Sequence, residues 1–313
     1  MALNGSGPIS LAGATAGQSI AVELGLSSTG AISLNQANVR TLAGVPSGTI
    51  IMPTNFYGKA NQFTYTVSSN QTNFCMRAGA VSAGWNTTSA LVVNINSGVI
   101  ISSNSTGTPG MTISGSYPGG VTVTNSGTIV GMGGSGASAR RNNSGLPGSA
   151  GGTALKVCSP VTFNNTPGTI AGGGGGGGSG GTGNSFFACC GVGPTNGGGG
   201  GGGRTGSTNS PGGDGGPGPF PAGSPGGAGT YAGAGGGGGG GPGGPEGGGG
   251  GPGGAGGTWG AVGGSGSTGA SCGGRSSPYT YGGGGGGGGG KATCGAPTYI
   301  TWTGNGTRFG SIS

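Results

Sequence analysis

The chain has 313 residues, of which 95 are glycine, and only 4% of its residues are charged, against roughly 25% in an ordinary globular domain. Histidine is absent, and ten cations against three carboxylates give a net charge of +7. These numbers exclude most catalytic arrangements, because a Ser-His or Cys-His pair requires histidine. A glycosidase requires two close carboxylates, whereas Asp214 and Glu246 stand in separate glycine-rich stretches. We expect no enzyme and no cofactor.

Residues 1–60 contain three similar runs, GPISLAG, GAISLNQ and GTIIMPT, each with a glycine before a short β-prone stretch. Between the second and third runs, Asn35 is placed as an N-cap and Gly44 as the glycine that ends a short helix. Val39 and Leu42, three residues apart, would share one face of that helix.

The segments GPISLAG, AGQSIAVELG, AISLNQANVRTLAG and SGTIIMPTNFYGKA occur in this order in residues 5–60. This stretch resembles the start of many bacteriophage tail proteins. The resemblance implies that residues 1–60 attach the chain to other tail or baseplate proteins, and it implies no catalytic residue.

Residues 61–171 predict short β-strands with almost no α-helix. FTYTVSS alternates with period two, and LVVNINSGVI, VTVTNSGTIV and VTFNNTPGTIA share one pattern: a β-branched run, asparagine, a turn ending in glycine, and a second β-branched run. Asparagine tolerates the left-handed backbone, so each turn can be a hairpin or a solenoid corner. We expect loosely stacked, β-solenoid-like rungs, with a β-sandwich as the alternative.

Residues 172–296 are dominated by glycine. Pure glycine runs occupy residues 172–178, 197–203, 235–241, 247–251 and 282–290. Glycine and proline at this density without a collagen period are typical of a disordered linker. The alternative is a bundle of polyglycine-II helices, which have three residues per turn and no internal hydrogen bonds, so that neighbouring helices bond to one another.

The xGG triplets between the runs favour the bundle. In a helix with three residues per turn, every x of a stretch such as PGGAGGT lies on one edge. We therefore expect the pure runs to be interior helices and the xGG stretches to be peripheral. The tail, residues 297–313, contains TYITWTG, whose alternation predicts a closing β-strand.

The segments between the glycine runs are rich in aromatic and small polar residues, the composition of a binding surface. An edge-sealing role for the aromatic residues is the alternative. The candidate receptor-binding residues are Phe186, Phe187, Phe220, Tyr231, Trp259, Tyr279 and Tyr281.

The five glycine runs and the loops between them resemble the adhesins that cap the long tail fibres of some T-even-like bacteriophages. The resemblance implies a virion tail protein whose loops bind a host surface receptor, either a polysaccharide or an outer-membrane protein. The N-terminal portion departs from that family. A structural minor tail or capsid-decoration protein without a receptor is the alternative, and the sequence is compatible with a single chain or a homotrimer.

Other features of the sequence predict where the protein is located, which partners it lacks and the state of its cysteines. The start has no export signal and no stretch reaches the length of a membrane span, so we expect assembly in the host cytoplasm without membrane insertion. The cations do not cluster among aromatic residues, so we expect no nucleic-acid partner. Six cysteines without a CxxC pair predict no metal site, and they are either free buried thiols or disulfides formed after release.

Overall fold

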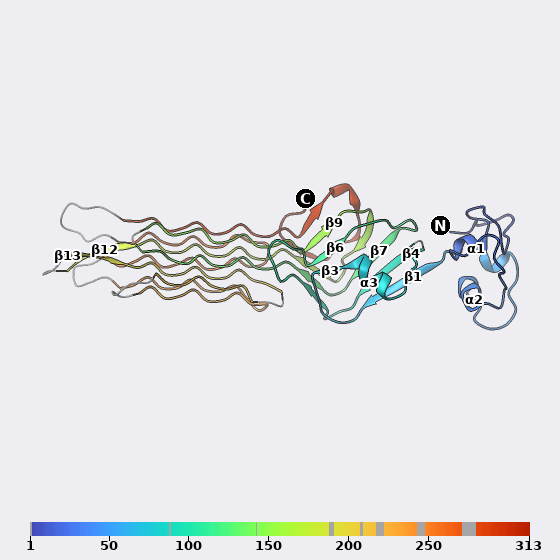
Figure 1. Ribbon diagram of the computed structural model, residues 1–313, viewed down its shortest axis with the longest axis horizontal. Coiled ribbons are helices and arrows are strands. Elements are labelled where there is room, and N and C mark those ends of the chain that lie inside the picture. The colour runs from blue at the N-terminus through green and yellow to red at the C-terminus, as the bar shows by residue number, and fades with distance from the viewer. Residues whose placement is uncertain are drawn as a thin grey trace.

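The computed structural model describes residues 2–87, 89–141, 143–187, 191–206, 209–216, 222–242, 248–270 and 280–313, with the side chains of residues 184–194 outside the description. The molecule is long and narrow (Figure 1). A small N-terminal unit (residues 2–61) lies at one end, and a β domain (residues 62–130, 153–171 and 293–313) lies in the middle. The glycine bundle, made of residues 131–152 and 172–292, extends away on the other side.

The N-terminal unit is held together by a small apolar cluster. It contains α1 (Ile20–Glu23), α2 (Ala37–Ala43) and the 3-10 helix η1 (Thr54–Phe56). The predicted helix is confirmed as α2, and Gly44 ends it with φ of 71°, although Gln36 and not Asn35 stands at its N-cap. The three β-prone runs form no named strand in this unit. Ile9, Ile32 and Ile50 of these runs instead pack in one cluster with Val39 and Phe56.

The β domain consists of three parallel sheets. The first has the order β1-β4-β7-β10-β15, the second β16-β11-β8-β5-β2, and the third β14-β9-β6-β3. The strands of the first sheet are β1 (Gln62–Val67), β4 (Ala90–Ile95), β7 (Val121–Asn125), β10 (Val161–Asn164) and β15 (Ile300–Gly304). Those of the second are β2 (Gln71–Thr72), β5 (Ile100–Ser102), β8 (Thr128–Val130), β11 (Thr169–Ala171) and β16 (Thr307–Phe309). The third contains β3 (Phe74–Cys75), β6 (Met111–Ile113), β9 (Leu155–Val157) and β14 (Thr293–Gly295).

The repeated motif forms corners, not hairpins. Each copy supplies one strand to the first sheet and the next strand to the second, and successive copies stack in parallel, as in the pairing of β4 with β7 and β5 with β8. The asparagines do not take the expected left-handed backbone, since φ is positive only at Gly98 in these turns. Asn125 and Asn165 are instead fully buried, and the Asn125 amide nitrogen donates to Asn165 Oδ1 over 2.8 Å.

The core of the β domain lies between the sheets. Strand residues alternate between inward and outward positions, and Leu91, Ile101, Met111, Leu155 and Phe163 are all at most 1% exposed. Helix α3 (Met76–Ser82) packs against β3 and β6, with Met76 and Ala80 in the same cluster. After η2 (Pro297–Tyr299), the tail supplies not one closing strand but two, β15 and β16, one to each of two sheets.

The glycine bundle is an insertion into this domain. The chain passes from the second sheet to the third four times, through residue 73, residues 103–110, residues 131–154 and residues 172–292. The last two connections extend into the bundle. Residues 131–152 therefore lie in the bundle, although the sequence analysis placed them with the β-rich residues 61–171.

Hydrogen bonds in the bundle recur every third residue. From residues 173–182, the amides of Gly173, Gly176 and Ser179 donate to residues 152, 149 and 146. The amides of residues 174, 177 and 180 donate to residues 204, 201 and 198, and those of 175, 178 and 181 donate to residues 261, 264 and 267. The carbonyls of the same segment accept from residues 134–137, 251–257 and 284–290. Residues 173–182 therefore bond to neighbours on every side.

Residues 197–204 are enclosed in the same way, and both of these segments are buried. Within the part of the chain that the structure describes, the segments around them form a closed ring in which each is hydrogen-bonded to the next. Around the ring they are residues 143–152, 282–290, 261–267, 251–257, 235–241, 224–229, 210–216 and 132–139.

The packing decides which glycines could be replaced by a residue with a side chain. A Cβ at Gly177 would overlap the carbonyl oxygen of Gly254, whereas a Cβ at Gly285 would meet nothing within 4 Å. Runs 172–178 and 197–203 are interior as expected, but runs 235–241 and 282–290 lie on the surface with only every third residue buried. The expectation that all pure runs are interior is therefore wrong, because the outward positions of these two runs have no steric need for glycine. In the stretch 252–258 the x residues are exposed, as expected.

Candidate functional site

The end of the glycine bundle away from the β domain, here called the distal end, gathers several turns. The antiparallel hairpin of β12 (Gly183–Phe187) and β13 (Gly191–Thr195) lies there (Figure 1). Backbone hydrogen bonds place other segments beside this hairpin. The Thr182 amide donates to the Asn143 carbonyl, the Tyr281 amide to the Thr182 carbonyl, and the Ala270 amide to the Gly249 carbonyl. Segments far apart in the sequence thus meet at one end of the molecule.

Three of the predicted site residues with a described backbone lie at this distal end. Phe186 and Phe187 are in β12, paired with Val192 and Gly191, and their side chains lie outside the description. Tyr281 is half-buried beside Thr182. Phe220 and Tyr279 lie outside the described residues.

Tyr231 and Trp259 lie at the opposite, proximal end of the bundle, beside the β domain. The Trp259 ring centroid is 5.3 Å from that of Tyr231 and 6.0 Å from that of Phe309 in β16. The Arg204 guanidinium lies over the Trp259 ring, 3.7 Å from its centroid, and Arg204 Nε donates to the Tyr231 carbonyl over 2.9 Å. These two aromatic residues therefore join the bundle to the β domain and are not neighbours of the distal turns.

Arg140 and Arg141 are exposed at the distal turn of the connection 131–154. The Thr182 hydroxyl lies 3.0 Å from the Arg140 carbonyl and 3.2 Å from that of Asn143, which fixes this turn against β12. The sequence analysis did not include this pair among the candidates, because it assigned residues 131–152 to the β domain. The small-residue runs GMGGSGAS and GSAGG, which flank the pair, are the feature of the sequence that could have assigned residues 131–152 to the bundle.

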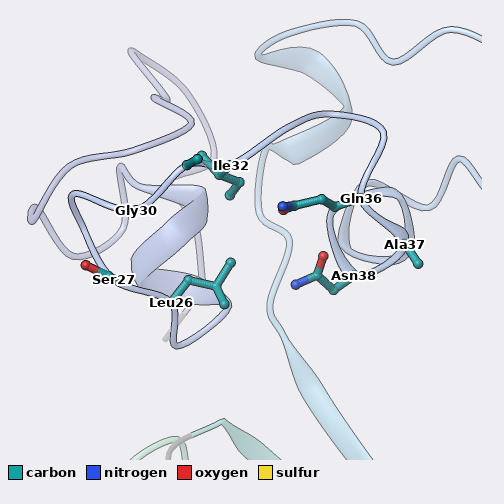
Figure 2. Close-up of a pocket in the computed structure, with 8 residues that line it drawn as sticks. Leu26, Ser27, Gly30, Ile32, Gln36, Ala37 and Asn38 are labelled. Carbon is teal, nitrogen blue, oxygen red and sulfur yellow. The ribbon is translucent and has the colours of Figure 1, made fainter.

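A pocket lies in the N-terminal unit. This pocket of about 580 Å³ is lined by Leu26, Ser27, Gly30, Ala31, Ile32, Gln36, Ala37 and Asn38. Figure 2 shows Leu26 and Ile32 on one side of this space, and Gln36 and Asn38, from the start of α2, pointing into it from the other. None of the lining residues is charged, so the pocket suits an uncharged group.

The β domain carries a tyrosine with a raised pKa and three free thiols. Burial, with a smaller contribution from nearby Cys75, raises the pKa of Tyr117 to about 12, and this ring stacks on Trp85 at 5.5 Å. Cys75, Cys158 and Cys294 are free thiols, but the first two are exposed and not buried as expected, while the other three cysteines lie outside the described residues. Across the described ranges, no group of three metal-binding side chains occurs.

One of three comparisons with known proteins gives a family. The family model for the phage tail fibre adhesin Gp38 matches residues 62–313. No curated protein matches the chain. Among solved structures, a chain from the crystal structure of the gp37-gp38 adhesin tip complex of the bacteriophage S16 long tail fiber is 21% identical, with a TM-score of 0.49. That match covers 96% of this chain and 99% of the other. In the described ranges, no helix has the length and apolar character needed to cross a membrane.

Proposed function

Because the chain belongs to the phage tail fibre adhesin family Gp38, and is therefore a receptor-binding protein of the virion tail, we propose that the distal end of its glycine bundle makes the contact with the host. The observation that carries this proposal is that hydrogen bonds bring segments far apart in the sequence together at this one end of the bundle. The candidate contacts at this end are Phe186, Phe187 and Tyr281, with Arg140 and Arg141 beside them. Phe220 and Tyr279, which lie outside the described residues, are candidates from the sequence alone. A host polysaccharide or outer-membrane protein fits such a surface.

The scaffold is best explained as a bundle of polyglycine-II helices. A period of three in the hydrogen bonds is what a helix with three residues per turn produces. Glycine is required at interior positions because a Cβ there would overlap a neighbouring backbone, as at Gly177. The β domain that carries the bundle is in turn best explained as a three-sided solenoid, since each rung supplies strands to successive sheets.

The distal end can be tested on the full-length protein by replacing aromatic residues at this end and, as a control, an aromatic residue away from it. The change of Phe186, Phe187 and Tyr281 to alanine should weaken binding to host cells by about tenfold or more, because aromatic hot spots contribute about 2 kcal/mol or more to an interface. Tyr299→Ala, in the β domain, should bind as the wild type does. Unchanged binding of the triple variant, together with unchanged host range after exchange of residues 183–195 and 270–281 between related adhesins, would refute the proposal.

We further infer that the N-terminal unit attaches the chain to another tail fibre protein. The family model begins at residue 62, and the unit before it has its own apolar cluster. The only lysines are Lys59, Lys156 and Lys291, which are exposed on the N-terminal unit, β9 and the proximal end of the bundle respectively. In intact particles treated with an amine cross-linker, Lys59 should be joined to another tail polypeptide. Cross-links from Lys156 and Lys291 alone would contradict this attachment.

A further inference from the structure

The pocket in the N-terminal unit lies beside an extended stretch of backbone without partners. The amides of Ala31, Ile32 and Ser33 and the carbonyls of Ala31 and Ile32 make no hydrogen bond to any described residue. Exposure alternates along this stretch, with Ile32 more buried than its neighbours, as along a half-exposed strand. Ala31 and Ile32 also line the pocket.

The equivalent stretch in the first run shows how such a backbone is satisfied. GPISLAG and GAISLNQ align Ser10 with Ser33. Ser10 forms a parallel bridge with Ser19: its amide donates to the Gln18 carbonyl over 2.7 Å, and its carbonyl accepts from the Ile20 amide over 3.0 Å. Ser10 therefore has a strand partner within the chain, whereas the amide of the equivalent Ser33 has none among the described residues.

The pocket beside the unpaired stretch has the chemistry of a side-chain site. Leu26 is 39% exposed, which is unusual for a leucine beside a core, and it faces the Gln36 and Asn38 amides across the pocket (Figure 2). The side-chain amide of Gln36 has no hydrogen-bond partner in the described ranges. An apolar side chain would be covered by Leu26 and Ile32, while a charged one would lose its hydration without a counter-charge.

We propose that residues 31–33 and this pocket dock an extended, uncharged segment of another tail fibre polypeptide. The segment adds as a strand along residues 31–33, so that its main chain pairs with the free amides and carbonyls. One of its apolar side chains enters the pocket between Leu26 and Ile32. This inference rests on the proposed attachment role of the N-terminal unit, and it names the surface and the chemistry of the contact.

Two exposed apolar residues of the same unit provide a matched test. Leu26→Asp places a charge in the docking pocket, and Ile51→Asp places one at a site that is 59% exposed and does not line the pocket. In complemented phage, Leu26→Asp should reduce the amount of full-length chain on purified particles by at least about tenfold, because a charge buried by the incoming segment has no counter-charge. Ile51→Asp should be incorporated as the wild type is.

A second measurement separates loss of docking from loss of folding. The free Leu26→Asp protein should bind host cells and unfold at the same temperature as the wild type. When the wild-type chain is added to particles that lack it, either the amides of Ala31 and Ser33 or that of Ile32 should gain protection from hydrogen exchange, because successive amides of a strand point to opposite sides. The amide of Ser10 should keep the protection it already has. Full incorporation of Leu26→Asp, or no gain at residues 31–33, would overturn the docking site. If Lys59 is still cross-linked to the fibre in that case, attachment stands and only the docking surface is wrong.

Discussion

At the scale of single residues, glycine has two different roles in this protein. In the interior segments its lack of a Cβ is a steric requirement, since neighbouring backbones lie where that atom would be. On the outward positions of residues 282–290 nothing lies within reach of an added Cβ. The same residue type in runs of similar length is therefore essential in one place and replaceable in another.

A pair of alanine substitutions measures this difference. Gly177→Ala should lower the free energy of unfolding by about 3 kcal/mol or more, because the methyl group forces interior backbones apart. Gly285→Ala should leave it within about 1 kcal/mol of the wild type, on the stabilising side, since alanine restricts the unfolded chain. Urea unfolding of the full-length variants gives both values, and equal effects at the two sites would contradict interior packing.

At the scale of elements, the corners between the first and second sheets depend on buried asparagine. Asn125 Oδ1 accepts from the Gly127 amide over 3.0 Å, and its amide nitrogen donates to Asn165. Asn165 in turn donates to the Thr307 carbonyl over 3.2 Å. The ladder therefore links three successive corners, including the one formed by the C-terminal tail.

Removal of this side chain should destabilise the stacked corners. Asn125→Ala leaves buried polar groups without partners, so it should cost about 1–3 kcal/mol of unfolding free energy. Asn104→Ala, at an exposed asparagine that accepts from Asn73 over 2.7 Å, should cost no more than about 0.5 kcal/mol. Thermal and urea unfolding compare the two variants, and a larger effect at Asn104 would argue against the buried ladder.

At the scale of the whole molecule, the distal end of the glycine bundle and the N-terminal unit lie at opposite ends of one long body (Figure 1). The glycine bundle leaves the β domain as an insertion and returns to it, so the two are joined through backbone strands on both sides. Trp259, between Tyr231 and Phe309, adds a side-chain contact where the bundle meets the second sheet. This contact couples the bundle to the β domain through side chains as well as through the backbone.

Loss of the tryptophan should loosen that junction. Trp259→Ala should lower the free energy of unfolding by about 2–4 kcal/mol, somewhat less than for a fully buried aromatic residue, and should raise hydrogen exchange at residues 229–231. Val262→Ala, three residues away and 67% exposed, should change stability by no more than about 0.5 kcal/mol. If the two variants behave alike, the aromatic contact does not couple the bundle to the β domain.

Local patterns in the sequence predicted the elements whose causes are local. Period-two alternation identified β1, the repeated motif identified the strands on both sides of each corner, and Gly44 identified the end of α2. The three β-prone N-terminal runs were expected to behave like strands and do not form named strands, because Ile9, Ile32 and Ile50 pack in a cluster with Val39 and Phe56. Local preference was outweighed there by packing.

By itself the sequence determined that the chain is rich in β-structure, and that its glycine falls into pure runs separated by segments with aromatic and polar side chains, which are the candidates for recognition. Composition and periodicity are sufficient for this because they set which backbone conformations and contacts are available. Only the tertiary structure decided which glycine runs are enclosed, that residues 131–152 join them, and that Tyr231 and Trp259 lie far from the distal turns. These facts depend on hydrogen bonds between residues distant in the sequence, such as Gly177 to Gly201, and no local pattern records which segments become neighbours.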